Sequence, residues 1–260
     1  MNIGMIGCGN MGTAILAGIH RTHKVCVCEA DKKRAAALKR KYRVEICEID
    51  CLAAKCDVVI LAVKPQGMEP VLEALSGSLR RVSLVVSIAA GITTKFLEKR
   101  LPAKTRVIRT MPNLPAQVAK GMTGICKGKN ASSRDAAIAR KIFGAVGSTM
   151  VIEEKMMDAL TAVSGSGPAY VYYFLECMVN AAHSLGFSKE ESIDLVRQTV
   201  SGSLQLLAAA NECPVALRKK VTSKGGTTEA AMKVFDGAKT MKVFEAAMKA
   251  ARARGKELAR

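Results

Sequence analysis

The chain of 260 residues contains no tryptophan and only three histidines, and aromatic residues make up 4% of it. Without aromatic side chains on which bases can stack, a dedicated binder of single-stranded nucleic acid is disfavoured. Long apolar runs are also missing. The longest strictly aliphatic run extends from Val58 to Val63, whereas a spanning helix needs about 20 apolar residues. No secretory leader precedes the first strand pattern at Met1–Ile6. We therefore expect a soluble, cytoplasmic protein that does not contact a membrane.

Acidic residues are scarce, because 22 Asp and Glu oppose 40 Lys and Arg and leave a formal net charge of +18. The basic residues are scattered along predicted helices, as at 32–34 and 252–256, rather than gathered in one stripe. This pattern favours a solvated basic surface over a nucleic-acid site. The same positive field attracts anionic small molecules such as a dinucleotide or an acid substrate.

Cysteine spacings typical of metal sites are absent from the sequence, although it contains nine cysteines. There is no CxxC pair and no Cys/His arrangement with zinc-finger spacing. Cys47, Cys51 and Cys56 can be read as a metal trio, but a tetrahedral site needs a fourth ligand and the nearby sequence offers no candidate. The odd number favours reduced thiols that pack as small apolar side chains. We therefore expect no metal site.

Short apolar runs alternate with helical patterns from residue 1 to about 152. The predicted strands are Ile3–Ile6, Val25–Cys28, Val58–Val63, Leu84–Ser87, Arg106–Arg109, Thr123–Cys126 and Thr149–Ile152. The predicted helices are Met11–His20, Lys32–Tyr42, Met68–Leu79, Thr94–Leu101 and Arg134–Phe143. This alternation predicts an α/β fold with a doubly wound, mostly parallel sheet. The run from Val58 to Val63 is apolar on both faces, as a central parallel strand requires.

Strand patterns stop after Glu153, and the remaining sequence predicts only helices and short loops. One predicted helix starts at Pro168, and a second follows the capping box at Ser188–Glu191. Three more are predicted at 214–220, 228–235 and 241–258. A helical unit with long apolar stripes often completes its core against a second copy. We therefore predict an α/β domain at 1–154 and an all-α dimerisation domain at 155–260, which makes the protein a homodimer.

A glycine-rich loop, GCGNMG at residues 7–12, follows the first predicted strand and opens a helix. Gly7 allows a tight turn, Gly9 lets the backbone approach a pyrophosphate, and Gly12 allows the helix to pack closely on the strand. In this context dinucleotide binding is favoured over a purely structural turn, and the first domain is predicted to be of the Rossmann type. The cofactor-binding candidates here are Ile6, Gly7, Cys8, Gly9, Asn10 and Met11.

Glu29 follows the second predicted strand, where the adenosine ribose of a bound dinucleotide is expected. A carboxylate there accepts hydrogen bonds from both ribose hydroxyls and repels a 2′-phosphate, which favours NADH over NADPH. Asp31 adds to this repulsion, and the basic residues 32–34 oppose it. The alternative interpretation is that Glu29 only caps the helix that starts near Asp31.

Small residues follow two further strands at the sheet edge where ligands bind in open α/β folds. They leave room for the nicotinamide ring and its ribose. The candidates are Ala62, Val63, Lys64, Pro65, Ile88, Ala89 and Ala90. Lys64 suits either a phosphate contact or an ordinary surface position. Residues 111–113 end another strand and are expected to shape the same cleft.

Two loops in the helical half combine backbone N–H groups with hydroxyls directly before helical patterns. They are SGSGPAY at 164–170 and TSKGGTTE at 222–229. Such a loop can hold a carboxylate on its amides and on the positive end of the following helix. The alternative is that Thr228 serves only as a helix N-cap. Because two consecutive glycines flanked by hydroxyls exceed what a cap needs, ligand binding is favoured.

These segments together resemble the pyrroline-5-carboxylate reductase family. The resemblance is carried by 160–170 and 221–229, and it extends to 6–11, 62–65, 87–91 and 109–113. It implies hydride transfer from NAD(P)H to the imine of 1-pyrroline-5-carboxylate to give L-proline, the final step of proline biosynthesis. It also implies a homodimer joined through the helical domain, and some members of the family assemble into larger oligomers of dimers.

The resemblance further implies roles for single residues. The substrate carboxylate is expected on Ser223, Gly225, Gly226 and Thr227, with Thr228 as the catalytic residue that hydrogen-bonds the ring nitrogen, and Thr161 is expected near the nicotinamide. Lys224 stands where many relatives have proline. Glu29 stands where the family more often carries residues suited to NADPH, so NADPH and NADH both stay open, with Glu29 favouring NADH.

Two other functions compete with this reading. A β-hydroxyacid dehydrogenase would show a helix lysine after its glycine-rich run, but no lysine follows 164–169 until Lys189. A non-enzymatic binder of nucleic acid would use the net charge of +18. His20, His23 and His183 lie outside the signature loops and are interpreted as structural.

Overall fold

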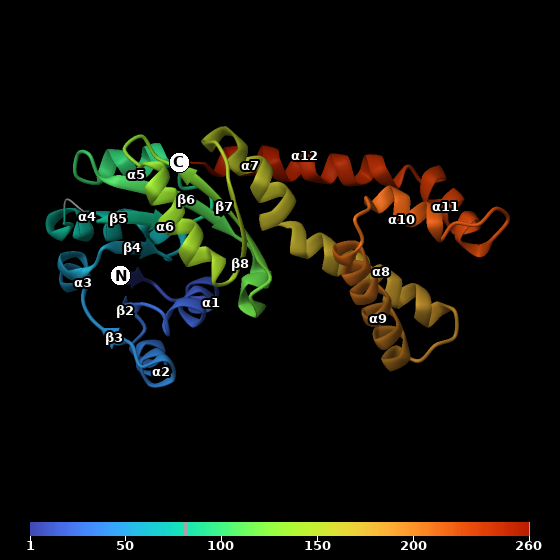
Figure 1. The fold of residues 1–260 in the computed structure, drawn as a ribbon, viewed down its shortest axis with the longest axis horizontal. Helices are drawn as coiled ribbons and strands as arrows, with labels where there is room; N and C mark the ends of the chain where they lie inside the picture. The colour runs from blue at the N-terminus through green and yellow to red at the C-terminus, as the bar shows by residue number, and fades with distance from the viewer. Residues whose placement is uncertain (81–82, 260) are drawn as a thin grey trace. The chain divides into compact units, whose positions relative to one another are not determined.

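The computed structural model describes residues 1–80 and 83–259. The chain divides into two compact units, which Figure 1 shows coloured along the sequence. Unit 1 comprises Met1–Pro168 and Ala251–Arg260, and unit 2 comprises Ala169–Ala250. In unit 1 the end of the last helix packs beside the sheet, because a Cβ on Gly91 would lie 2.8 Å from the carbonyl oxygen of Leu258. The division at 154/155 stays a prediction about domains.

Unit 1 is built on an eight-stranded sheet with the order β3-β2-β1-β4-β5-β6-β7-β8. Its strands are β1 (Asn2–Ile6), β2 (Lys24–Cys28), β3 (Glu45–Ile46), β4 (Val58–Leu61), β5 (Leu84–Ser87), β6 (Arg106–Pro112), β7 (Gly121–Lys127) and β8 (Gly147–Val151). Neighbouring strands are parallel except β6 and β7, which are antiparallel. The order reverses beside β1, so the carboxyl ends of β1 and β4 flank the point where open α/β sheets bind ligands.

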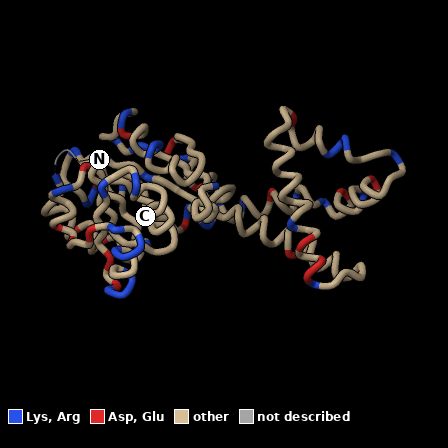
Figure 2. Tube along the Cα trace, turned by 60° about the horizontal axis from the view of Figure 1, so that its bottom comes forward, with Lys and Arg blue, Asp and Glu red and all other residues tan. Residues whose placement is uncertain are grey.

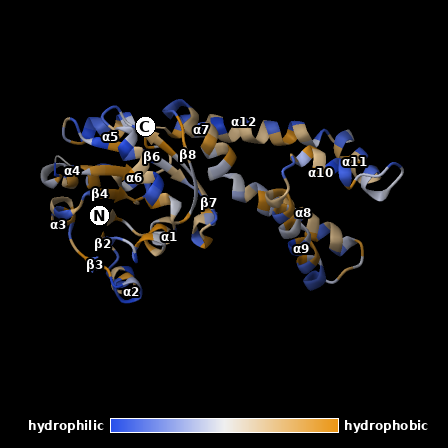
Figure 3. Ribbon diagram, viewed as in Figure 1, coloured by the Kyte–Doolittle hydropathy of each residue, from blue (hydrophilic) through white to orange (hydrophobic). Residues whose placement is uncertain are grey.

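Helices cover both faces of this sheet. They are α1 (Asn10–Ile19), α2 (Lys32–Tyr42), α3 (Ile49–Lys55), α4 (Met68–Ser78), α5 (Thr94–Arg100), α6 (Ser133–Gly144) and α7 (Met157–Leu160). Strand β4 is buried on both sides: Val58 and Ile60 join a cluster with α1 and α6, whereas Val59 and Leu61 join one with α3, α4 and α5. Figure 3 shows the apolar colouring of the strands. This two-sided burial confirms the predicted doubly wound sheet.

Unit 2 is entirely helical in the part of the chain that the structure describes. Its elements are the continuation of α8 (Gly167–Ser184), then α9 (Lys189–Ala209), α10 (Pro214–Lys220), α11 (Thr227–Gly237) and most of α12 (Thr240–Leu258). The capping boxes predicted at Ser132 and Ser188 are both confirmed. Figure 2 shows Lys and Arg distributed over both units. Within the described ranges, no helix combines the length and apolar character that crossing a membrane requires.

Unit 2 leaves a large apolar surface open between α8 and the helices α11 and α12. A groove of about 580 Å³ is lined by Tyr173, Phe174, Phe235, Val243 and Phe244, among others. Tyr173 remains 68% exposed, and the hydroxyl of Tyr170 in the same groove is buried without a hydrogen-bond partner. Apolar surface of this extent is typical of a surface that another protein chain covers.

Candidate active site

The glycine-rich loop between β1 and α1 has the geometry that its sequence predicts. Gly7 has φ +81°, and a Cβ there would lie 2.8 Å from Cγ1 of Val63. A Cβ on Gly12 would lie 3.0 Å from the carbonyl oxygen of Gly7, so this glycine allows close packing of the helix. Gly9 is the N-cap of α1 and has no atom within 4 Å of a Cβ position. The positive end of α1 is therefore open to a phosphate group.

Main-chain hydrogen bonds hold three loops at the same edge of the sheet. The amide of Gly7 donates to the carbonyl of Cys28 at 2.8 Å, and the amide of Ala62 donates to the carbonyl of Ile6 at 2.8 Å. The amide of Ile88 donates to the carbonyl of Leu61 at 3.1 Å. The predicted cofactor residues at 6–11, 62–65 and 88–90 thus follow the carboxyl ends of neighbouring strands. Lys64 is exposed and immediately precedes a short 3-10 turn at Pro65–Gly67.

Glu29 connects the glycine-rich loop to the start of α2. Its carboxylate accepts hydrogen bonds from the amide of Cys8 at 2.8 Å and from the amide of Asp31 at 3.1 Å. It lies 4.0 Å from the guanidinium of Arg34. The N-cap of α2 is Asp31, whose side chain accepts from the amides of Lys33 and Arg34. The contact of Glu29 with the amide of Asp31 fits the alternative that Glu29 supports the start of this helix, and its contact with a ribose stays a prediction. The carboxylate places negative charge beside the glycine-rich loop.

Thr161 lies in a π-helical turn at Thr161–Gly165, which follows α7. Its hydroxyl donates to the carbonyl of Met157 at 2.8 Å. The loop predicted before the helix at Pro168 is wrong for Ser164 and Gly165, which belong to this turn, and only Ser166 forms a bend before α8 begins at Gly167. π-helical turns occur frequently at functional sites. Sequence periodicity gave no signal for this turn, since one wide turn does not change the pattern of apolar residues enough to be seen.

Asn113 fastens the π-helical turn to the sheet. Its side-chain amide donates to the carbonyl of Ser164 at 3.1 Å and to the hydroxyl of the same residue at 3.2 Å. Its side-chain oxygen accepts from the amide of Met122 at 2.8 Å. The predicted cleft-shaping segment 111–113 thus positions the turn that contains Thr161.

Arg109 makes the second connection between the sheet and the chain that follows β8. It is 3% exposed, and it pairs with Glu154 and, at 3.8 Å, with Asp158. Glu154 begins a 3-10 turn (Glu154–Met156) and Asp158 belongs to α7. Sequence reasoning included Arg109 in a signature segment but gave it no role, because its partners lie more than forty residues away in the chain.

The loop at 222–229 in unit 2 turns sharply and then opens α11. Gly225 has φ +72°, and the amide of Gly226 donates to the carbonyl of Ser223 at 3.1 Å. The N-cap of α11 is Gly226, without a side-chain cap. The alternative that Thr228 serves only as the N-cap is therefore wrong, since Thr228 lies inside the first turn.

A carboxylate of the chain itself already occupies one of the predicted binding amides. The amide of Gly225 donates to Oε2 of Glu229 at 2.6 Å, and the other oxygen of Glu229 lies 3.5 Å from Nζ of Lys233. This contact supports the view that the loop can hold an acid group. That the loop faces the glycine-rich loop, as the sequence predicts, stays a prediction.

Metal ligands do not gather in the described parts of the chain. Across residues 1–80 and 83–259, no group of three or more His, Cys, Asp or Glu side chains is placed to hold a metal ion.

Comparison with known proteins gives matches over both parts of the chain. Residues 154–258 match a family model described as pyrroline-5-carboxylate reductase dimerisation, and residues 2–91 match one described as NADP oxidoreductase coenzyme F420-dependent. A pyrroline-5-carboxylate reductase of Pseudomonas aeruginosa is 36% identical over 263 residues, which cover 99% of this chain and 96% of the relative. One from Escherichia coli is 38% identical, covering 90% of this chain and 89% of the relative.

Solved structures of similar proteins agree with these matches. A pyrroline-5-carboxylate reductase from Coxiella burnetii aligns with a TM-score of 0.94 at 36% identity, covering 100% of this chain and 98% of that one. A Plasmodium falciparum pyrroline carboxylate reductase with NADP bound aligns with a TM-score of 0.88 at 30% identity, covering 100% and 98%. A semialdehyde dehydrogenase NAD-binding protein from Cupriavidus necator, at 17% identity and a TM-score of 0.63, shares the fold.

Proposed function

The chain belongs to the pyrroline-5-carboxylate reductase family, and we propose that its loop at 223–228 holds 1-pyrroline-5-carboxylate while the imine is reduced to L-proline by NAD(P)H. Identity of 36% over 99% of the chain to a reductase of this name is the observation that carries the activity. The protein is an NAD(P)-dependent oxidoreductase, and its product places it in proline biosynthesis.

The residues of unit 1 fit a dinucleotide. The open N-terminus of α1, with no atom within 4 Å of a Cβ position on Gly9, suits the pyrophosphate. We assign the nicotinamide end to Ala62–Pro65, Ile88–Ala90 and Thr161, which lie at or beside the carboxyl edge of the sheet. When bound, the nicotinamide supplies the hydride. These residues orient the cofactor and exclude water from it.

The residues of the 223–228 loop fit a small cyclic imino acid. The amides of Gly225 and Gly226, together with the hydroxyls of Ser223 and Thr227, are suited to a carboxylate. Thr228 hydrogen-bonds the ring nitrogen and thereby orients C5 of the ring. A protonated imine is already electrophilic, so the step needs orientation rather than a strong acid–base pair.

The helical part fits a homodimer. We propose a homodimer through the predicted domain at 155–260, with larger oligomers of dimers as the family resemblance implies. The match of the dimerisation model to residues 154–258 and the open apolar groove of unit 2 both support this proposal. The nine cysteines are free thiols, which supports a reducing, cytoplasmic location.

The assay that tests this function measures oxidation of NADH and of NADPH with 1-pyrroline-5-carboxylate, and proline as product. We expect turnover with both coenzymes and none without the imine. If neither coenzyme is oxidised by the folded protein, the proposed activity is excluded. Steeply salt-dependent binding of nucleic acid by that inactive protein would favour the alternative binder.

Glu29→Gln tests the proposed preference for NADH. The glutamine oxygen can still accept from the amide of Cys8, so the variant removes the charge while keeping the contact. We expect the wild type to favour NADH. We expect the ratio of kcat/KM for NADPH to that for NADH to rise about tenfold in the variant, since like charges brought together cost free energy. Glu48→Gln, at an exposed position, is the matched control. An unchanged ratio would mean that the charge of Glu29 does not determine which coenzyme the protein prefers.

Glu229→Ala tests whether the carboxylate of Glu229 competes with the substrate. Because it accepts from the amide of Gly225 at 2.6 Å, an incoming carboxylate must displace it. We expect KM for the imine to fall about threefold to tenfold with kcat unchanged, since a hydrogen bond to a charged group contributes about 1.5–3 kcal/mol and only part of that opposes binding. Asp236→Ala, on the exposed face of α11, is the control. A higher KM would mean that Glu229 shapes the loop for the substrate.

A further inference from the structure

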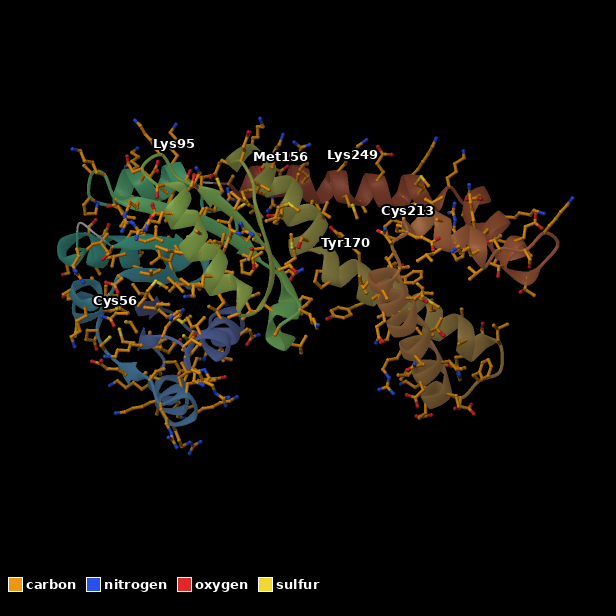
Figure 4. The ribbon with its side chains drawn as sticks, in the orientation of Figure 1. Cys56, Lys95, Met156, Tyr170, Cys213 and Lys249 are labelled. Carbon is orange, nitrogen blue, oxygen red and sulfur yellow. The ribbon has the colours of Figure 1, made fainter. Side chains whose placement is uncertain are left out.

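Cysteines from β2, from the end of α3 and from the segment after β3 gather at one side of unit 1, away from the glycine-rich loop. Cys26 lies in β2, and Cys56, which Figure 4 labels, is the C-cap of α3. Their Sγ atoms are 3.4 Å apart and both residues are buried. Cys47, beyond the end of β3, lies within hydrogen-bonding reach of Cys26.

Gly4 makes this approach possible. In the register of the sheet, Gly4 of β1 pairs with Cys26 of β2, so β1 separates Cys26 from the strand that follows Cys56. A Cβ on Gly4 would lie 3.1 Å from Sγ of Cys56. The missing side chain therefore leaves the space above β1 that Leu52 and Sγ of Cys56 occupy.

The two thiols differ in their chemistry. The hydrogen bond from Cys26 lowers the pKa of Cys56, whereas the same bond and burial raise the pKa of Cys26. Cys56 is thus the better nucleophile of the pair. A cleft of about 320 Å³ that Cys26 and Cys56 both line, together with Lys24, Glu45 and Lys55, gives a small molecule access from solvent.

We propose that Cys26 and Cys56 are an oxidation site that forms a reversible disulfide with hydrogen peroxide as the oxidant. The Cys56 thiolate attacks one peroxide oxygen and the O–O bond breaks. Hydroxide is the leaving group, and Cys56 becomes a sulfenic acid. Sγ of Cys26 then attacks Sγ of Cys56 and water leaves with the proton of Cys26. Two thiols and one peroxide give one disulfide and two waters. The sulfur atoms must close from 3.4 Å to about 2.05 Å.

Peptide mapping tests this site without relying on catalysis. The full chain is treated with peroxide, its remaining thiols are blocked with N-ethylmaleimide in denaturant, and it is digested with trypsin. Cleavage after Lys24 and Lys55 puts Cys26 and Cys56 on different peptides, while Cys28 stays on the peptide of Cys26. We expect one linked pair of peptides, with one N-ethylmaleimide on Cys28, that is two hydrogens lighter than the sum of these parts and that reduction separates.

Variants and fragmentation assign the link. It should disappear in Cys26→Ala and in Cys56→Ala and persist in Cys28→Ala, the matched control on the same peptide. Fragmentation of the linked wild-type peptides distinguishes Cys26 from Cys28 even where a variant does not fold. A link from Cys28 to Cys56, a link from Cys26 to Cys47, or no link at a peroxide concentration that oxidises the exposed Cys213 would each overturn the proposal.

Discussion

Replacing Thr228 by alanine is expected to lower kcat/KM for 1-pyrroline-5-carboxylate by about tenfold to several hundredfold, the loss of one hydrogen bond that orients the ring. Thr228 lies in the first turn of α11 and is half-buried, and the N-cap of that helix is Gly226. The substitution therefore removes no cap from the helix. Steady-state kinetics at saturating NADH or NADPH measure the effect.

Thr228→Ser is the control that separates the hydroxyl from the shape of the side chain. Serine keeps the oxygen and should retain most of the activity, whereas alanine loses it. Because the proposed hydrogen bond orients the imine for hydride transfer, the loss should appear in kcat as well as in KM. If Thr228→Ala showed wild-type kinetics, this residue would have no part in the step. If the alanine and serine variants lost the same amount of activity, the role of Thr228 would be packing.

The sequence predicts most of the sheet because the signals for it are local. The run Val58–Val63 is apolar at every position, and the structure buries β4 between helices on both faces. The glycines at 7 and 12 each have a local requirement, a positive φ or a close approach, that glycine meets, so their roles could be stated before the fold was known. The capping boxes at Ser132 and Ser188 span only four residues each.

What the sequence does not predict depends on contacts between distant residues or on very short elements. Strand β3 has two residues, too few for a pattern to emerge. Helix α3 is not predicted, although α5, which also has seven residues, is. The contact of Glu29 with the amide of Cys8 arises because β1 and β2 lie side by side, and no spacing indicates it. The π-helical turn at Thr161–Gly165 is held by Asn113, which directly follows β6 and is far from the turn in sequence.

Glu154→Ala is expected to lower the free energy of unfolding by about 3 kcal/mol, near the low end of the cost of leaving a buried charge without its partner. Arg109 is 3% exposed, and after the substitution Asp158, at 3.8 Å, is the acidic partner that the described part of the chain would still provide. The value stays at the low end because Glu154 is itself 34% exposed and water partly screens the pair. Urea denaturation followed by circular dichroism measures the change.

Glu153→Ala is the matched control, because Glu153 is the neighbouring carboxylate and its pair with Lys155 lies on the surface, with side chains 71% and 76% exposed. Its removal should change stability by less than about 0.5 kcal/mol. Equal losses in the two variants would mean that burial of Arg109 contributes little. A selective loss in Glu154→Ala would show that this ion pair fastens the segment after β8 to the sheet. Since α7 and the π-helical turn follow directly, the position of Thr161 depends on the same charge pair.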